Sequence, residues 1–102
     1  WGGINPNTGA DCSGFVQYVM RNAAGVSLPR TSREQAKVGR SIKSSEMLPG
    51  DLIFYANSGG TVNHVAMYIG NGQIVHAASR KSGIKISTWN YRSPKTIRRV
   101  LN

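Results

Sequence analysis

One cysteine and two histidines are the side chains of this 102-residue chain whose types suit covalent catalysis. Cys12 stands where a stretch rich in glycine, asparagine and proline, residues 1–10, gives way to a helical pattern. The first turn of a helix presents unpaired N–H groups and the positive end of the helix dipole, and both favour the nucleophilic thiolate. A lone cysteine is otherwise most often a small buried hydrophobe. The polar neighbours Asp11 and Ser13 and the small Gly14 favour an accessible thiol here.

His64 and His76 are the only histidines, and they fall in two predicted strands over residues 62–69 and 73–78. Nucleophilic catalysis requires a base, commonly histidine, that is oriented by a second polar group. Two histidines in adjacent strands of one hairpin match that requirement. The alternative is a pair of structural histidines without a chemical role.

The turn between the two strands decides which faces the imidazoles occupy, because side chains alternate along a strand. A strict two-residue turn at Asn71-Gly72 pairs Gly70 with Gln73 and sends the two imidazoles to opposite faces. A three-residue loop pairs Ile69 with Gln73 and brings both to one face within reach of each other. A bulge elsewhere in the hairpin has the same effect. The catalytic hypothesis therefore predicts an odd loop or a bulge.

Zinc binding is the rival use of the same three residues. Cys12, His64 and His76 are acceptable ligand types, but the sequence lacks a close ligand pair such as His-x-x-x-His. We therefore favour catalysis over metal binding.

The periodicity of apolar residues divides the chain into a helical first half and a second half of strands. An apolar stripe from Phe15 to Ala23 predicts a helix over residues 12–24 that ends at Gly25. Ser32 to Gln35 matches a capping box and predicts a short helix as far as Val38. Strands are expected at residues 52–56, which are apolar on both faces, and at 62–69, 73–78, 84–87 and 96–101. This order predicts the α+β class, with helices segregated to one side of an antiparallel sheet.

Composition and charge limit the classes of function. Lys and Arg number 13 against 4 Asp and Glu, for a net charge of +9, which attracts polyanions such as nucleic acid, anionic lipid or bacterial wall polymers. The bland alternative is a solvated surface, and no helix-turn-helix, zinc-finger or RNA-binding motif is present. No apolar run approaches the ~20 residues that span a bilayer, and no signal-peptide pattern is visible. A single cysteine excludes an internal disulfide and a four-cysteine zinc site.

Aromatic and acidic side chains supply further candidates. A sugar- or peptide-binding groove is one interpretation of the aromatic residues, and burial in the core is the other: Trp1, Tyr55, Tyr68, Trp89 and Tyr91. Asp51 follows Pro49-Gly50 and is expected to belong to the turn. Asp11 adjoins Cys12 and serves either as a helix N-cap or as a partner for a substrate amine.

Six segments, in this order, resemble the NlpC family of bacterial cell-wall cysteine endopeptidases, and the resemblance extends over nearly the whole chain. Each segment alone is a weak signal, whereas the ordered set at this spacing is highly specific. The segments are Trp1-Gly2-Gly3, Asp11-Cys12-Ser13-Gly14-Phe15-Val16-Gln17, Leu28-Pro29-Arg30-Thr31-Ser32, Leu48-Pro49-Gly50-Asp51-Leu52-Ile53-Phe54, His64-Val65-Ala66-Met67-Tyr68-Ile69-Gly70 and Ile74-Val75-His76-Ala77.

The resemblance implies a papain-like α+β fold, with N-terminal helices packed on a central antiparallel sheet. It implies one catalytic domain over residues 1–102, which we expect to be a piece of a longer multidomain protein. Cys12 would be the nucleophile, His64 the general base and acid, and His76 the residue that orients His64. Substrate contacts are expected from Trp1, Asp11 and Ser13. The resemblance implies neither a metal nor an organic cofactor.

The substrate implied by the resemblance is the stem peptide of bacterial peptidoglycan, cut through an acyl-enzyme. The bond is often that between D-γ-glutamate and the following diamino acid. Two alternatives remain open: an N-acetylmuramoyl-L-alanine amidase, and a non-catalytic wall-binding module on the same fold. We expect a secreted or extracellular, wall-associated monomer that binds anionic wall polymers through its basic surface, with no membrane span and no nucleic-acid partner.

Overall fold

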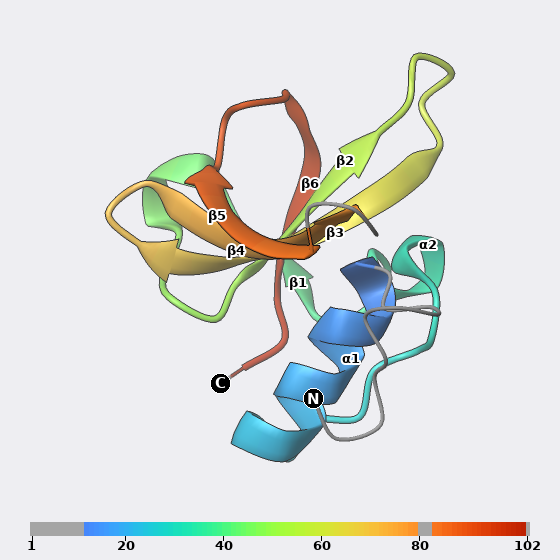
Figure 1. The fold of residues 1–102 in the computed structure, drawn as a ribbon, viewed down its shortest axis with the longest axis vertical. Coiled ribbons are helices and arrows are strands. Elements are labelled where there is room, and N and C mark those ends of the chain that lie inside the picture. Colours follow the sequence, from blue (N-terminus) through green and yellow to red (C-terminus); the bar gives the residue numbers. More distant parts are fainter. Residues whose placement is uncertain (1–11, 80–82, 102) are drawn as a thin grey trace.

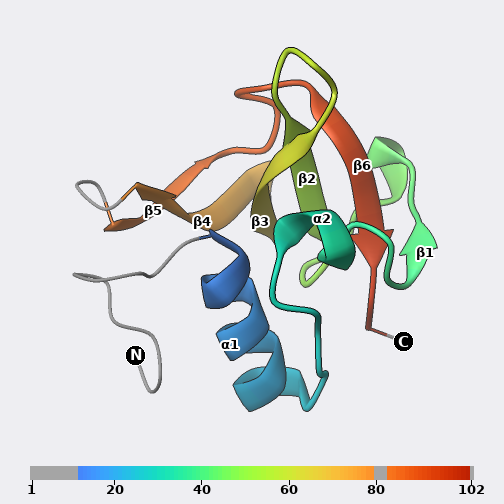
Figure 2. The same cartoon turned by 90° about the vertical axis from the view of Figure 1, so that its right-hand side faces the viewer.

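The structure is a computed structural model that describes residues 12–79 and 83–101. Its elements in chain order are α1 (Cys12–Ala24), α2 (Ser32–Gln35), β1 (Arg40–Ser41), the 3₁₀ turn η1 (Ser44–Glu46), β2 (Leu52–Ala56), β3 (Val62–Gly70), β4 (Gln73–Ser79), β5 (Gly83–Thr88) and β6 (Pro94–Arg99). The strands form one antiparallel sheet in the order β1-β6-β2-β3-β4-β5 (Figure 1). Both α-helices pack against β3, and α1 also packs against β4 (Figure 2). This arrangement confirms the predicted α+β class.

Helix α1 begins and ends where the sequence predicts. Phe15, Val16 and Met20 form the buried stripe that faces the sheet. At the other end, Gly25 adopts φ +68° and donates to the carbonyl of Arg21, while the next N–H bonds the carbonyl of Met20. The bond from Gly25 to Arg21 is the 5→1 bond of the αL C-cap, which glycine favours because it has no Cβ. No helix of the described residues is long and apolar enough to cross a membrane.

The predicted capping box of α2 is wrong by one residue. Thr31, not Ser32, is the N-cap: its hydroxyl oxygen accepts from the N–H of Glu34 at 3.3 Å. The third helical residue is therefore Glu34 instead of Gln35, and the helix ends at Gln35 instead of Val38. Thr31 and Glu34 satisfy the same Thr-x-x-Glu pattern one step earlier, and the Thr31 hydroxyl also donates to the Glu34 carboxylate at 3.1 Å.

Gln35 has a different role, which explains why it is not part of the cap. Its side chain is fully buried, and its amide nitrogen donates to the carbonyls of Ser13 (3.0 Å) and Pro29 (2.8 Å). A nearby side chain, Arg30, donates to the hydroxyl of Ser13 at 3.1 Å. These bonds attach the segment before α2 to the first turn of α1, so they help fix the start of the helix that carries Cys12.

Most strand predictions are confirmed, with shifts at the ends of β5 and β6. The sequence missed β1 and η1 and placed β6 two residues too late. A two-residue strand such as β1 shows no alternation, so only its pairing with β6 identifies it. Asp51 does belong to the turn before β2, since its carboxylate accepts from the N–H of Leu48 at 2.9 Å and from the Arg99 guanidinium.

Two apolar clusters lie on opposite faces of the sheet, and β2 contributes to both, as predicted. The first cluster contacts α1 and contains Phe15, Val16, Met20, Leu28, Ala36, Leu52, Phe54, Val65 and Ala77. The second cluster contains Ile42, Ile53, Tyr55, Ala66, Ile74 and Ile97. Alternation along β2 sends Leu52 and Phe54 to the first cluster and Ile53 and Tyr55 to the second.

A pair of glycine variants tests how tightly β1 is held against β6. Gly39 has φ +72°, and a Cβ there would overlap the carbonyl oxygen of Arg99. Gly39→Ala should therefore cost about 1 kcal/mol of left-handed strain and a further ~1–3 kcal/mol for displaced backbone. The control is Gly25→Ala, because φ there is +68° and nothing lies within 4 Å of its added Cβ. Urea unfolding should show a larger loss for Gly39→Ala; equal losses would contradict this packing.

Candidate active site

The hairpin of β3 and β4 contains the bulge that the catalytic hypothesis required. Gly70 pairs with Gln73 across a two-residue turn, in which Asn71 and Gly72 have φ of +55° and +74°. Two positive φ values suit the right-handed twist of a hairpin. The next pair, however, is Tyr68 with Ile74, so one residue of β3 is left over between the two pairs. That extra residue, Ile69, reverses the parity of the hairpin.

The two histidines consequently lie on one face of the sheet. The last pair of this ladder is Met67 with Val75, and one more step in the same register sets His76 opposite Ala66 and diagonal to His64. Nε2 of His64 lies 2.7 Å from Nδ1 of His76, and the ring planes cross at 71°. This distance is a short hydrogen bond. The prediction that the hairpin brings the imidazoles together is confirmed.

A third polar group extends the histidine pair. Nε2 of His76 lies 3.0 Å from Oγ of Ser87 on β5. Ser87 is paired with Ile74, which lies two residues before His76 on β4, so the side chains of Ser87, Ile74 and His76 share one face of the sheet. Sequence reasoning missed Ser87, because a serine in a short strand has no distinctive signal. The only available clue was that residues 84–87 were expected to form the strand after that of His76.

Burial keeps both imidazoles neutral. His64 is 9% exposed and His76 2% exposed. Burial lowers the pKa of His64 to about 4, helped by the neighbouring charges of His76 and Arg92. The pKa of His76 is also lowered, first by burial and then by the ammonium of Lys85. A neutral imidazole at physiological pH has one bare nitrogen, which is what a general base needs.

Aromatic rings enclose the pair on the side of β2. Tyr55 pairs directly with His64, with ring centroids 5.8 Å apart. Tyr91 lies edge-on to Tyr55, with ring centroids 5.3 Å apart. The centroid of the Tyr91 ring also lies 5.5 Å from that of His76. Burial raises the pKa of Tyr55, as does Tyr91, with Arg92 opposing. The Tyr55 hydroxyl therefore stays protonated.

The Tyr55 hydroxyl and the guanidinium of Arg92 fix the loop that follows β5. The hydroxyl donates to the carbonyl of Trp89 at 2.5 Å. Arg92 lies 5.5 Å from the centroid of the Tyr55 ring and donates to the carbonyl of Ala56 (2.9 Å) and to Oδ1 of Asn63 (3.2 Å). The loop between β5 and β6 is thus attached to the strands beside His64.

Cys12 is the first residue of α1 and is half-buried, in contact with the first cluster. Its helix packs over β3 and β4, the strands of the two histidines. The imidazoles alternate with Val65 and Ala77, which belong to the first cluster, so the rings themselves lie on the second-cluster face. The structure therefore brings His64 and His76 together, and it places Cys12 at the start of the helix that packs against their strands. The pairing of its sulfur with His64 belongs to the proposed function.

The predicted substrate-binding residues have different outcomes. Ser13 is buried, and its hydroxyl accepts the hydrogen bond from Arg30. Trp1 and Asp11 lie outside the described residues. The structure gives the zinc alternative no support, because within residues 12–79 and 83–101 no three His, Cys, Asp or Glu side chains are placed to hold one metal ion.

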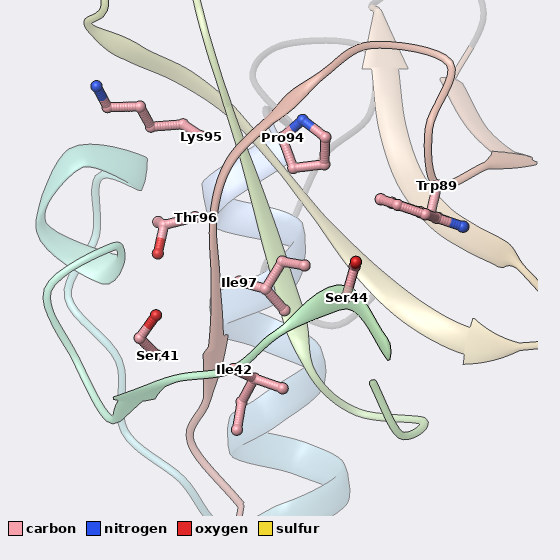
Figure 3. Close-up of a pocket in the computed structure, with 8 residues that line it drawn as sticks. All are labelled: Ser41, Ile42, Ser44, Trp89, Pro94, Lys95, Thr96 and Ile97. Carbon is pink, nitrogen blue, oxygen red and sulfur yellow. The ribbon is translucent and has the colours of Figure 1, made fainter. Parts of the chain in front are cut away.

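A pocket of about 360 Å³ opens on the second-cluster face, between β6 and the segment at residues 41–44 (Figure 3). It is lined by Ser41, Ile42, Ser44, Trp89, Pro94, Lys95, Thr96 and Ile97. Tyr55 connects this pocket to the histidines, because it pairs with Pro94 on one side and with His64 on the other. Of the aromatic residues predicted to line a groove, Trp89 lines this pocket, Tyr91 is 44% exposed, and Tyr55 is core.

Comparison with known proteins places this geometry in a family. The model of the NlpC/P60 family matches residues 1–100. The Gamma-DL-glutamyl hydrolase of Bacillus subtilis is 43% identical over 89 residues, which are 87% of this chain and 21% of that protein. The Murein DD-endopeptidase MepS/Murein LD-carboxypeptidase of Escherichia coli is 46% identical over 88 residues, 86% of this chain and 46% of that protein.

A solved structure agrees with these sequence matches. The structure of an NlpC/P60 family protein from Bacillus cereus superposes with a TM-score of 0.84 at 34% identity, over 92% of this chain and 32% of that chain. The chain therefore belongs to the NlpC/P60 family, and the expected papain-like α+β fold is confirmed. It spans less than half the length of either curated relative.

The lowered pKa of His64 predicts a loss of stability in acid. Between its ordinary value of 6.5 and about 4, the unfolded chain binds a proton at His64 that the folded chain does not. The free energy of unfolding should therefore decrease as the pH is lowered through this interval, and His64 should account for about 3 kcal/mol of the decrease. His76 acts in the same direction. Urea unfolding at a series of pH values should show this slope, and His64→Gln should flatten it; an equal slope in both proteins would contradict the assignment.

Proposed function

We propose that this chain is a cysteine endopeptidase that cuts the stem peptides of bacterial peptidoglycan. The observation that carries the proposal is the buried, hydrogen-bonded pair of His64 and His76 on the strands under the helix that begins at Cys12. Family membership supports the same chemistry, since relatives matched over most of this chain are named as hydrolases and endopeptidases.

Proton transfer in this proposal runs through Nδ1 of His64, because its Nε2 is bonded to His76. Nδ1 takes the proton of the Cys12 thiol, and the sulfur attacks the carbonyl carbon of the scissile amide. Backbone N–H groups at the start of α1 donate to the developing oxyanion; one such donor contributes roughly 100-fold or more. The imidazolium of His64 then protonates the leaving amine as the carbon–nitrogen bond breaks.

Hydrolysis of the acyl-enzyme uses the same groups in reverse. Neutral His64 removes a proton from water, which attacks the thioester carbonyl. The carbon–sulfur bond then breaks, the sulfur takes the proton back from the His64 imidazolium, and the second peptide product is released as the acid. His76 holds the ring of His64 in position through both steps. The cycle needs no group beyond these side chains, the backbone and water.

The bond between D-γ-glutamate and the following diamino acid is our proposed cleavage site. The name of the Bacillus subtilis relative, a gamma-DL-glutamyl hydrolase, supports this bond. The Escherichia coli relative is named for DD-endopeptidase and LD-carboxypeptidase activities at similar identity. Sequence identity to these two relatives therefore does not determine which bond is cut, whereas the muropeptide products identify it directly.

The net charge of +9 suits a protein that works at the cell wall. Wall polymers carry phosphate and carboxylate groups, so a basic surface concentrates the enzyme near its substrate. We accordingly propose a secreted or extracellular protein that associates with the wall as a monomer.

Replacement of the nucleophile tests the mechanism. Cys12→Ala should lower cleavage of purified peptidoglycan by at least ~1000-fold, because no other group can form the thioester. His64→Gln should lower cleavage and also slow alkylation by iodoacetamide, which reports only on Cys12 because the chain has one cysteine. The control is the Gly25→Ala variant, whose substitution lies at the far end of α1 from Cys12.

Mass spectrometry of the digested muropeptides identifies the bond in the same experiment. A new amino terminus on the diamino acid supports the proposal. Release of the stem peptide from muramic acid identifies an amidase instead. Wall binding without any cleavage by the wild type would leave only a binding module, and cleavage retained by Cys12→Ala would overturn the mechanism.

Wall binding should weaken as salt is added, because mobile ions screen exposed charges over a Debye length of about 8 Å at physiological ionic strength. Sedimentation of the catalytically inactive Cys12→Ala variant with purified walls measures the bound fraction without digestion. Sucrose at matched osmolarity is the control for effects other than screening. A bound fraction that does not change with salt would contradict an electrostatic attachment.

A further inference from the structure

The hydrogen-bond chain of the histidine pair ends at Ser87. The two contacts are in series: Nε2 of His64 to Nδ1 of His76 at 2.7 Å, then Nε2 of His76 to Oγ of Ser87 at 3.0 Å. Of the described residues, only these three take part in hydrogen bonds of the two imidazoles. The chain runs across three neighbouring strands, β3, β4 and β5.

Because the contacts are in series, one proton position fixes the others. A neutral imidazole carries a single N–H. If His76 donates from Nε2 to Ser87, its Nδ1 is an acceptor, His64 must donate from Nε2, and Nδ1 of His64 is bare. If Ser87 donates instead, His76 donates from Nδ1, and His64 carries its own proton on Nδ1. Only the first arrangement leaves a base.

We propose that Ser87 is a positioning residue: its oxygen accepts the N–H of His76 and so holds the tautomer that leaves Nδ1 of His64 free to take a proton. This inference rests on the proposed function for its effect on rate. The protonated intermediate needs the same arrangement, since an imidazolium at His64 still donates from Nε2 to Nδ1 of His76. Ser87 therefore accepts throughout the cycle.

The charges around the chain favour neutral links within it. Lys85 pairs with His76 across β4 and β5, and Arg92 acts on His64 from the loop after β5. Both cations oppose a second proton on the imidazoles. A carboxylate in place of Ser87 would favour the charged form of His76. A hydroxyl orients the ring without adding a charge, so Nδ1 of His76 stays an acceptor.

Two substitutions at Ser87 separate orientation from packing. Ser87→Ala removes the acceptor and should lower kcat/KM for muropeptide cleavage about fivefold. Ser87→Thr keeps a hydroxyl on a β-branched residue that suits a strand, and should retain activity within about twofold. Thr88→Ala is the matched control, because this neighbouring side chain is exposed and faces the other side of β5.

Nitrogen-15 NMR of the histidine rings gives a readout that a merely structural role would not move. In the wild type and in Ser87→Thr, His76 should show the Nε2–H tautomer and His64 a bare Nδ1. In Ser87→Ala, both rings should shift toward a mixture of tautomers, while the backbone spectrum stays folded. Wild-type ring shifts in Ser87→Ala would overturn the proposal, as would a wild type that shows the Nδ1–H tautomer at His76.

The same measurements distinguish this proposal from the proposed function. A tautomer change in Ser87→Ala, together with a wild type that cleaves no peptidoglycan, supports the positioning role and refutes the endopeptidase. A fivefold loss of rate with unchanged ring shifts refutes the positioning role and leaves the endopeptidase standing.

Discussion

The hydrogen bond between His64 and His76 depends on one residue that has no partner in the sheet. Side chains in a strand alternate between two faces, so a hairpin with a plain two-residue turn at Asn71-Gly72 would send these histidines to opposite sides. The bulge at Ile69 shifts the register by one and places both on the face of Tyr55. The hairpin thus keeps a regular two-residue turn and still places both histidines on one face, because the extra residue lies in β3 beside the turn and not within it.

Burial gives this pair its chemical character. Burial lowers the pKa of His64, so an imidazolium there at neutral pH needs a negative charge close by to stabilise it. In the proposed reaction that charge is the thiolate, followed by the oxyanion of the intermediate. The proton should therefore move as the sulfur attacks, rather than rest as a stable ion pair beforehand. Neutral groups behind His64, first His76 and then Ser87, are consistent with a base that must give the proton back.

The sequence predicted most of the fold because its signals are local. The apolar stripe of α1 and the glycine after it defined the helix, and the hairpin was recognisable from its turn. The short β1 and the exact cap of α2 were missed, since Thr31 and Ser32 both satisfy the capping pattern and only the burial of Gln35 distinguishes them. For the two histidines to share a face, the sequence allowed either a three-residue loop or a bulge in the hairpin, and the structure has the bulge. Ser87 was beyond sequence reasoning, because its role arises from the pairing of β5 with β4.

The positions of β3, β4 and β5 in the sheet determine how firmly His64, His76 and Ser87 are held. β3 lies between β2 and β4, and both helices pack against it, so the strand that carries His64 is held from several sides. β5 is an edge strand whose ladder runs only to β4, so Ser87 is held from one side. A substitution near Ser87 therefore perturbs proton placement while the base keeps its position, whereas a change beside His64 alters both. This asymmetry places the adjustable part of the site at the edge of the sheet, because few packing contacts oppose change there.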